Sequence, residues 1–187
     1  MSDAPLSVSL EFTPNPNTLK FVVNRQFLER GAANFTAASE TSLSPLAKSL
    51  FEIPGVAAVM LGTNFVTITK TTTGDWDILA EEVPETIGKH FASGQPALSK
   101  DWAAAPAATG DESAIEKKIK EILDNEIRPA VAMDGGDITF GRYDEGVVYL
   151  QLQGACSSCP SSIATLKMGV EARLKEVIPE IKEVVQL

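Results

Sequence analysis

Two cysteines, Cys156 and Cys159, stand where a strand pattern gives way to a helix pattern, and they are the only cysteines of the chain. Upstream, residues 147–152 are typical of a buried or half-buried strand. Downstream, Pro160 fits the first helical position, because its missing N–H is not needed there. We therefore expect both thiols at an exposed helix start, outside any core, where the helix dipole and unpaired N–H groups favour thiolate. The apolar residues of this helix recur at helical spacing: Ile163, Leu166, Val170, Leu174 and Val177.

The composition predicts a soluble chain of one or two domains. It has 187 residues, of which 44% are hydrophobic, and no apolar run is long enough to cross a membrane. With 16 Lys and Arg against 25 Asp and Glu, the net charge is −9. This charge argues against nucleic acid or an anionic membrane surface as the main partner. Small molecules, metals and other proteins remain as candidates.

The N-terminus and the cysteine spacing bear on the cellular compartment. Residues 1–6 lack a basic region followed by an apolar core, so we expect no secretory signal, and they are not Arg-rich like a transit peptide. Two cysteines close in sequence fit a redox or metal motif in a reducing compartment better than a structural disulfide. The expected location is the bacterial cytoplasm, or the mitochondrial matrix if the sequence is a processed chain.

Residues 1–92 alternate short strand and helix patterns and are expected to form the first domain. The turn residues 13–18 link a hairpin, Ser44-Pro45 begins a short helix, and Asp75 caps a longer helix that Pro84 can kink. Residues 24–43 are expected to be irregular. The expected strands cover residues 6–12, 19–23, 56–61 and 65–69, and the longer helix runs to about residue 91.

Residues 93–110 lose the apolar periodicity and are rich in Ala, Pro and Gly, which predicts a linker. Trp102 is unusual in such a segment, because a lone exposed Trp is uncommon. It is expected to dock on one of the domains.

Residues 111–187 are expected to form the second domain. A helix begins at Ser113 or Asp111, strands follow at 138–143 and 147–152, the cysteine helix ends at Pro179, and a last strand covers 181–187. The predicted fold class is α+β, with two small α+β domains joined by the Ala/Pro/Gly-rich linker. The apolar stripe of the first helix consists of Ile115, Ile119, Ile122, Leu123 and Ile127.

Other residues that could carry chemistry are expected to be structural. The run Asp134-Gly-Gly-Asp137 is interpreted as a simple turn whose acids bind nothing. Met133 and Met168 are expected in a core, and His90 at the surface of a helix end. From spacing alone, the two cysteines leave a redox pair, a metal site and no special role all open.

The stretch Gly154–Lys167, GACSSCPSSIATLK, resembles the signature of the NifU C-terminal domain. Arg128-Pro129 and Asp134–Ile138 match the upstream motif of the same family. Thr13–Phe21, TPNPNTLKF, resembles the N-terminal domain of Nfu-type proteins. The resemblance implies an Nfu-type N-terminal domain over 1–92, a NifU-like C-terminal domain with the CxxC motif over 111–187, and an iron–sulfur cluster carrier that is not an enzyme.

Ligand counting agrees with a cluster shared between two chains. Iron–sulfur clusters are normally held by four thiolates, whereas one chain has only Cys156 and Cys159, and its single imidazole, His90, lies in the other domain. Two chains complete the set, so the expected cofactor is a [4Fe–4S] cluster between subunits, with a [2Fe–2S] form as an alternative. Zinc accepts the same four thiolates.

Two hypotheses of different classes follow. The first is a cluster carrier that forms a cluster-bridged homodimer and has apo iron–sulfur proteins and upstream cluster donors as partners. The second is a thiol–disulfide oxidoreductase in which Cys156 and Cys159 are the attacking and resolving thiols. Anaerobic reconstitution separates them, because only the carrier should take up iron and become coloured.

Overall fold

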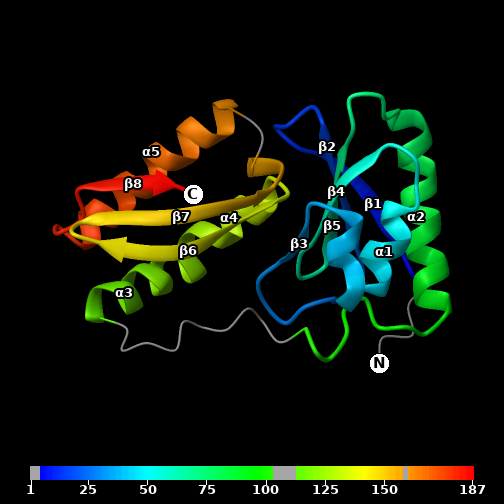
Figure 1. Cartoon of the computed structure of the whole chain (residues 1–187), viewed down its shortest axis with the longest axis horizontal. Coiled ribbons are helices and arrows are strands. Elements are labelled where there is room, and N and C mark those ends of the chain that lie inside the picture. The colour runs from blue at the N-terminus through cyan, green and yellow to red at the C-terminus, as the bar shows by residue number, and fades with distance from the viewer. Residues whose placement is uncertain (1–4, 103–112, 158–159) are drawn as a thin grey trace. The chain divides into compact units, whose positions relative to one another are not determined.

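The computed structural model describes residues 5–102, 113–157 and 160–187. The chain divides into two compact units, Met1–Ala103 and Ala104–Leu187. Each unit contains both helices and a sheet (Figure 1), so the predicted α+β class with two small domains is confirmed. The borders at residues 92, 93 and 110 remain predictions.

The first unit is built on an antiparallel five-stranded sheet with the order β1-β2-β5-β4-β3. The predicted hairpin is confirmed, with Val8 opposite Val23 and Phe12 opposite Leu19. Apolar side chains that alternate along the strands, such as Phe21, Val59 and Ile68, form the core. The strands are β1 (Val8–Phe12), β2 (Thr18–Val23), β3 (Ala33–Phe35), β4 (Val56–Leu61) and β5 (Phe65–Lys70).

Two α-helices cover one face of this sheet (Figure 1), α1 (Pro45–Phe51) and α2 (Trp76–Ala92). Both begin at the predicted caps. The Ser44 Oγ accepts from the Ala47 N–H at 3.1 Å, and the Asp75 Oδ1 accepts from the Asp77 N–H at 2.9 Å. Pro84 lies inside α2, which continues past it.

The expectation of irregular structure over residues 24–43 was wrong in two places. β3 pairs with β4, and its Ala33 and Phe35 are buried. The 3₁₀ helix η1 (Ala38–Leu43) follows directly. A strand of three residues is too short for its alternation to stand out from a loop.

The chain from residue 93 to Trp102 packs on the first unit. The Ser99 N–H donates to the Leu43 carbonyl at 2.8 Å, and the Ser44 Oγ donates to the Ala97 carbonyl at 2.8 Å. The rings of Phe35 and Trp102 lie 5.4 Å apart between centroids. Trp102 therefore docks on the first unit, and the remainder of the predicted linker lies outside the described residues.

His90 was expected at the surface, but it is buried, with 6% of its area exposed. The docked segment explains the error, because the backbone of Pro96 and Gln95 bonds to the imidazole and covers the end of α2. The His90 Nε2 is buried without a hydrogen-bond partner. Desolvation lowers the pKa of His90, and the two backbone bonds oppose this only in part.

The second unit packs its helices on a three-stranded sheet with the order β6-β7-β8. β6 and β7 form the predicted hairpin, and β8 runs parallel to β7. One core cluster contains side chains of the sheet and of the helices, among them Ile119, Ile138 and Val170. The elements are α3 (Ala114–Ile122), η2 (Leu123–Ile127), α4 (Arg128–Met133), β6 (Gly136–Asp144), β7 (Val147–Gly154), η3 (Ala155–Ser157), α5 (Pro160–Val177) and β8 (Glu183–Gln186).

The first helix of this unit begins at Ser113, the first of the two predicted caps. The Ser113 Oγ accepts from the Glu116 N–H at 3.2 Å, and the Glu116 carboxylate accepts from the Ser113 N–H at 2.9 Å, which forms a capping box. The helical run continues beyond the predicted stripe, because the π-helical turn η2 joins α3 to α4. Met133 and Met168 were predicted in a core and are instead exposed.

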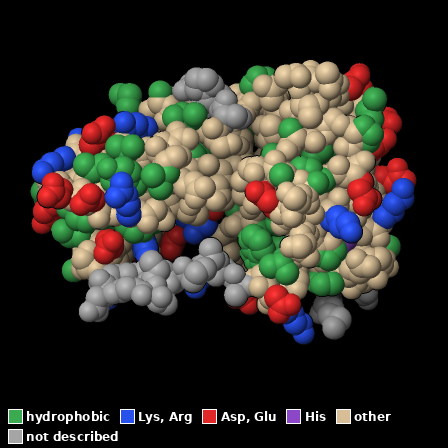
Figure 2. Space-filling view, in the orientation of Figure 1, with side chains coloured by type: hydrophobic (Ala, Val, Ile, Leu, Met, Phe, Trp, Pro, Cys, Tyr) green, Lys and Arg blue, Asp and Glu red, His purple; other side chains and the backbone are tan. Residues whose placement is uncertain are grey.

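The surface of the described residues is mixed in charge. On the face shown in Figure 2, acidic and basic side chains are interspersed over both units, and no large basic region is visible among the described side chains there. Within the described residues, none of the helices is both long and apolar enough to span a bilayer.

Candidate cysteine site

The cysteine loop begins where β7 ends at Gly154. Gly154 has a φ of +63°, a left-handed conformation that residues with a Cβ rarely adopt, so glycine is favoured at this turn. The chain then enters η3, and the Ser157 Oγ donates to the Gly154 carbonyl at 2.8 Å. This turn leads from the sheet to α5, which begins at Pro160 as predicted.

Cys156 lies in η3 and packs in the core cluster of the second unit. Only 4% of its area is exposed, so the prediction of an exposed thiol was wrong for this residue. Cys156 lies just before the helix, as predicted, but its sulfur lies against Gly136 of β6, which the local sequence pattern does not indicate. Cys159 lies outside the described residues, and its place at the helix start remains a prediction.

A floor of two glycines lies directly beneath Cys156. The Ala155 N–H donates to the Gly135 carbonyl at 3.1 Å, and Gly136 pairs with Gly154 across β6 and β7. A Cβ added to Gly136 would lie 2.5 Å from the Cys156 Sγ. No side chain other than hydrogen fits at Gly136 while Cys156 occupies its present position.

Asp137, the residue after this floor, is held by Arg128. The Arg128 Nε donates to the Asp137 Oδ1 at 2.8 Å, and the Nη2 donates to the Oδ2 at 2.7 Å. The interpretation of Asp134-Gly-Gly-Asp137 as a turn whose acids bind nothing was therefore wrong for Asp137, although Asp134 is exposed. The hydrogen bonds that Arg128 donates to Asp137 raise the pKa of Arg128, against an opposing effect of desolvation.

Sequence reasoning missed this pairing, although both residues stood in the motif that the family resemblance marked. Nine positions separate Arg128 from Asp137, and the π-helical turn before Arg128 changes the direction in which its side chain leaves the helix. The turn leaves no signal in the apolar pattern. Two charged residues of opposite sign inside one short motif were the available indication.

The described residues supply one thiol to this site. Among them, no group of three or more His, Cys, Asp or Glu side chains is arranged to hold a metal ion. Thiolate sulfur is a ligand that suits soft metals.

Two family profiles match the chain. Residues 119–185 match the NifU-like domain, and residues 8–94 match the domain described as scaffold protein Nfu/NifU N terminal. Among solved structures, the solution structure of a NifU-like protein from Saccharomyces cerevisiae is 28% identical, covers 54% of this chain and 91% of its own, and has a TM-score of 0.47.

Curated relatives align over nearly the whole chain. The human protein named NFU1 iron-sulfur cluster scaffold homolog, mitochondrial, is 40% identical over 96% of this chain and 71% of its own length. The protein of that name from Drosophila grimshawi is 45% identical, and this chain spans only 61% of it. NifU-like protein 4, mitochondrial, from Arabidopsis thaliana is 42% identical over 96% of this chain and 65% of its own length. The chain therefore belongs to the family of NifU-like proteins that carry an Nfu-type N-terminal domain.

Proposed function

We propose that this chain carries an iron–sulfur cluster on Cys156 and Cys159, shared between two copies, and delivers it to apo-proteins. The observation that carries the proposal is the cysteine loop, which follows β7 and rests on Gly135 and Gly136. The names of the relatives, which describe iron–sulfur cluster scaffolds, support it.

The number of thiols favours two copies per cluster. The chain contains two cysteines, and a cluster is normally held by four thiolates. Each thiol releases its proton to solvent as the sulfur binds iron, so uptake is linked to pH. We propose the [4Fe–4S] form, with [2Fe–2S] as the alternative that iron analysis distinguishes.

The burial of Cys156 adds a step to cluster uptake. A sulfur that packs inside one subunit cannot also bond to iron shared with a second subunit. The η3 turn must therefore move away from Gly136 before Cys156 binds the cluster.

Partners and compartment follow from the carrier role. Upstream cluster donors and apo iron–sulfur proteins are the proposed partners, and no catalytic turnover is needed. The word mitochondrial in the names of the relatives favours the matrix over the bacterial cytoplasm.

Anaerobic reconstitution tests the proposal. The full chain should gain a broad absorption band near roughly 400 nm and about two irons per chain, as one four-iron cluster per two chains requires. Cys156→Ser and Cys159→Ser should each abolish stable binding. Ser157→Ala is the matched control, because it removes a hydroxyl of the same loop and should leave the iron content unchanged.

Three results would contradict this function. They are full iron content in either cysteine variant, a colourless protein that holds zinc, and catalytic reduction of a disulfide substrate without iron.

A further inference from the structure

The segments Arg128-Pro129 and Asp134–Ile138 contain no cysteine, yet an ion pair between Arg128 and Asp137 joins them. Three guanidinium nitrogens of Arg128 are engaged, two by Asp137 and the Nη1 by the Asp124 Oδ1 at 2.8 Å. Asp137 is 5% exposed. A bidentate pair to a buried carboxylate fixes both partners in orientation as well as in distance.

Stability alone does not account for such a pair. A buried ion pair is often replaceable by apolar residues without loss of stability, whereas removal of one partner leaves an uncompensated charge. The ion pair instead fixes the geometry of the residues beside it. Asp137 is held in place, and with it Gly136, the neighbouring residue on which Cys156 rests.

The backbone before Arg128 is also unusual. The Arg128 N–H donates to the Leu123 carbonyl, five residues back, which makes the turn π-helical. Such turns occur often at functional sites. The helical run thus presents Arg128 to the start of β6, beside the cysteine loop.

We propose that the Arg128–Asp137 ion pair is a positioning element that keeps Cys156 closed on Gly136, in a state that must open before the cluster binds. This rests on the proposed function, since the ligand role of Cys156 is itself a proposal. Neither Arg128 nor Asp137 touches the cluster. Their role is to fix the Gly135–Gly136 floor, so that return of Cys156 to the floor favours release of the cluster.

The proposal has a quantitative consequence. When only the open fraction of a protein binds, the apparent dissociation constant is the intrinsic one divided by that fraction. Weakening the closed state therefore exposes Cys156 more often in the apo protein and also tightens cluster binding. A merely structural role predicts the opposite, because damage to the site should weaken cluster binding.

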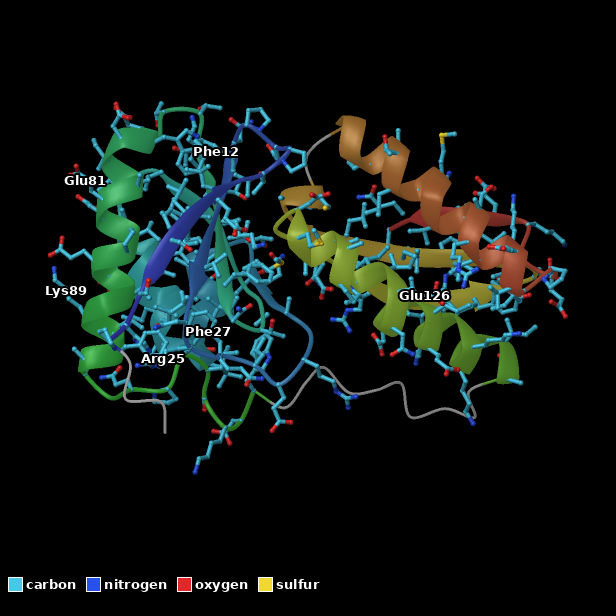
Figure 3. All side chains as sticks on the ribbon, turned by 180° about the vertical axis from the view of Figure 1, so that it is seen from behind. Phe12, Arg25, Phe27, Glu81, Lys89 and Glu126 are labelled. Carbon is cyan, nitrogen blue, oxygen red and sulfur yellow. The ribbon has the colours of Figure 1, made fainter. Side chains whose placement is uncertain are left out.

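The first measurement is the alkylation rate of Cys156 by iodoacetamide in the apo full chain, with Cys159→Ser so that one thiol remains. Arg128→Gln should raise this rate about tenfold or more without denaturant. The matched control is Arg173→Gln, which breaks a pair of the same bidentate geometry with Glu126, at 2.7 and 3.1 Å. Glu126 (Figure 3) and Arg173 are both more exposed than half-buried Arg128 and buried Asp137, so the control rate should stay within about twofold of the parent.

Two further variants separate positioning from folding. Arg128→Met with Asp137→Leu removes both charges and leaves no unpaired buried ion, so it should fold as the parent does and still alkylate quickly. Arg128→Lys keeps the charge but cannot form the bidentate hydrogen bonds of a guanidinium group. Its alkylation rate should lie between those of the parent and Arg128→Gln. Rates repeated at low urea should not increase if the opening is local.

The second measurement uses the two-cysteine chain loaded with cluster and titrated with EDTA. The double variant at 128 and 137 should retain its cluster to higher EDTA than the parent chain, and Arg173→Gln should match the parent. Unchanged alkylation, or a cluster lost at lower EDTA in the double variant, overturns the positioning role. A parent chain that never takes up a cluster overturns the proposed function instead, which keeps the two failures distinct.

Discussion

Replacing Gly136 by Ala tests directly how tightly Cys156 rests on its floor. The new Cβ would lie 2.5 Å from the Cys156 Sγ, 3.0 Å from the Gln153 carbonyl oxygen and 3.1 Å from the Cys156 Cβ. The first distance is far below van der Waals contact, and the second involves backbone of β7 that cannot rotate away. Overpacking of this kind typically destabilises by about 1 to 3 kcal/mol.

Part of this destabilisation is relieved if Cys156 moves away from Gly136. If Cys156 leaves the floor, only the contact with Gln153 remains, so the destabilisation cannot exceed the cost of opening plus that residual contact. Gly136→Ala should therefore lose stability and also alkylate faster at Cys156. With m near 1 to 2 kcal/mol/M, the urea midpoint of the second unit should fall by roughly 1 M.

The aromatic residues allow the two units to be followed separately. Both tryptophans, Trp76 and Trp102, lie in the first unit, so their fluorescence should keep its urea midpoint. Far-UV circular dichroism reports both units, and the part of its transition that the tryptophan signal does not share follows the second unit. Gly169→Ala is the matched control, because nothing lies within 4 Å of its added Cβ and it lies inside α5. It should stabilise the second unit by about 0.5 to 1 kcal/mol. A Gly136→Ala protein with unchanged midpoint and unchanged alkylation would refute the reasoning.

Three other predictions concern the rest of the chain. Because burial lowers the folded-state pKa of His90 below its unfolded value of about 6.5, its contribution to stability is full above that pH. It is lost as pH falls below about 6.5, by at most about 1.4 kcal/mol per pH unit, and tryptophan-monitored urea unfolding of His90→Leu should lack that slope. Limited proteolysis should cut first on the C-terminal side of Trp102, since the chain before it packs on the first unit, and a stable fragment that still contains both units would contradict this. Light scattering should find apo protein mainly monomeric and cluster-loaded protein dimeric or larger, because metal binding energy becomes association energy; an apo dimer unchanged by the cluster would show that another surface makes the contact.

Local patterns predicted most of the fold correctly. The hairpin of β1 and β2 follows from alternation around a Pro/Asn-rich turn, and the caps Ser44, Asp75 and Ser113 mark three helix starts where their side chains accept backbone N–H bonds. Such signals depend on residues within a few positions of one another, and so they can be read before any tertiary structure is known.

The errors about burial share one cause, which is that burial depends on what covers a residue from elsewhere in the chain. His90 lies at a helix end, where exposure is usual, but the segment through Trp102 folds back over it. Met133 and Met168 are apolar and yet exposed, because nothing in the spacing of single methionines states which side of a helix faces the sheet. The exposure of Cys156 was predicted from its place before α5, whereas its sulfur lies against Gly136 of β6 and packs in the core cluster.

A cluster shared by two chains also determines how strongly the closed state of Cys156 should lower the apparent affinity for the cluster. If each of two chains must release its own Cys156, the apparent affinity for the cluster depends on the square of the open fraction, because both openings are required. Across Arg128→Lys, the double variant at 128 and 137, and Gly136→Ala, a tenfold rise in alkylation rate should then tighten cluster retention about a hundredfold. A plot of log affinity against log alkylation rate should have a slope of about two. A slope near one would mean that only one Cys156 of the pair binds the cluster, and a slope of zero that Cys156 binds without leaving Gly136.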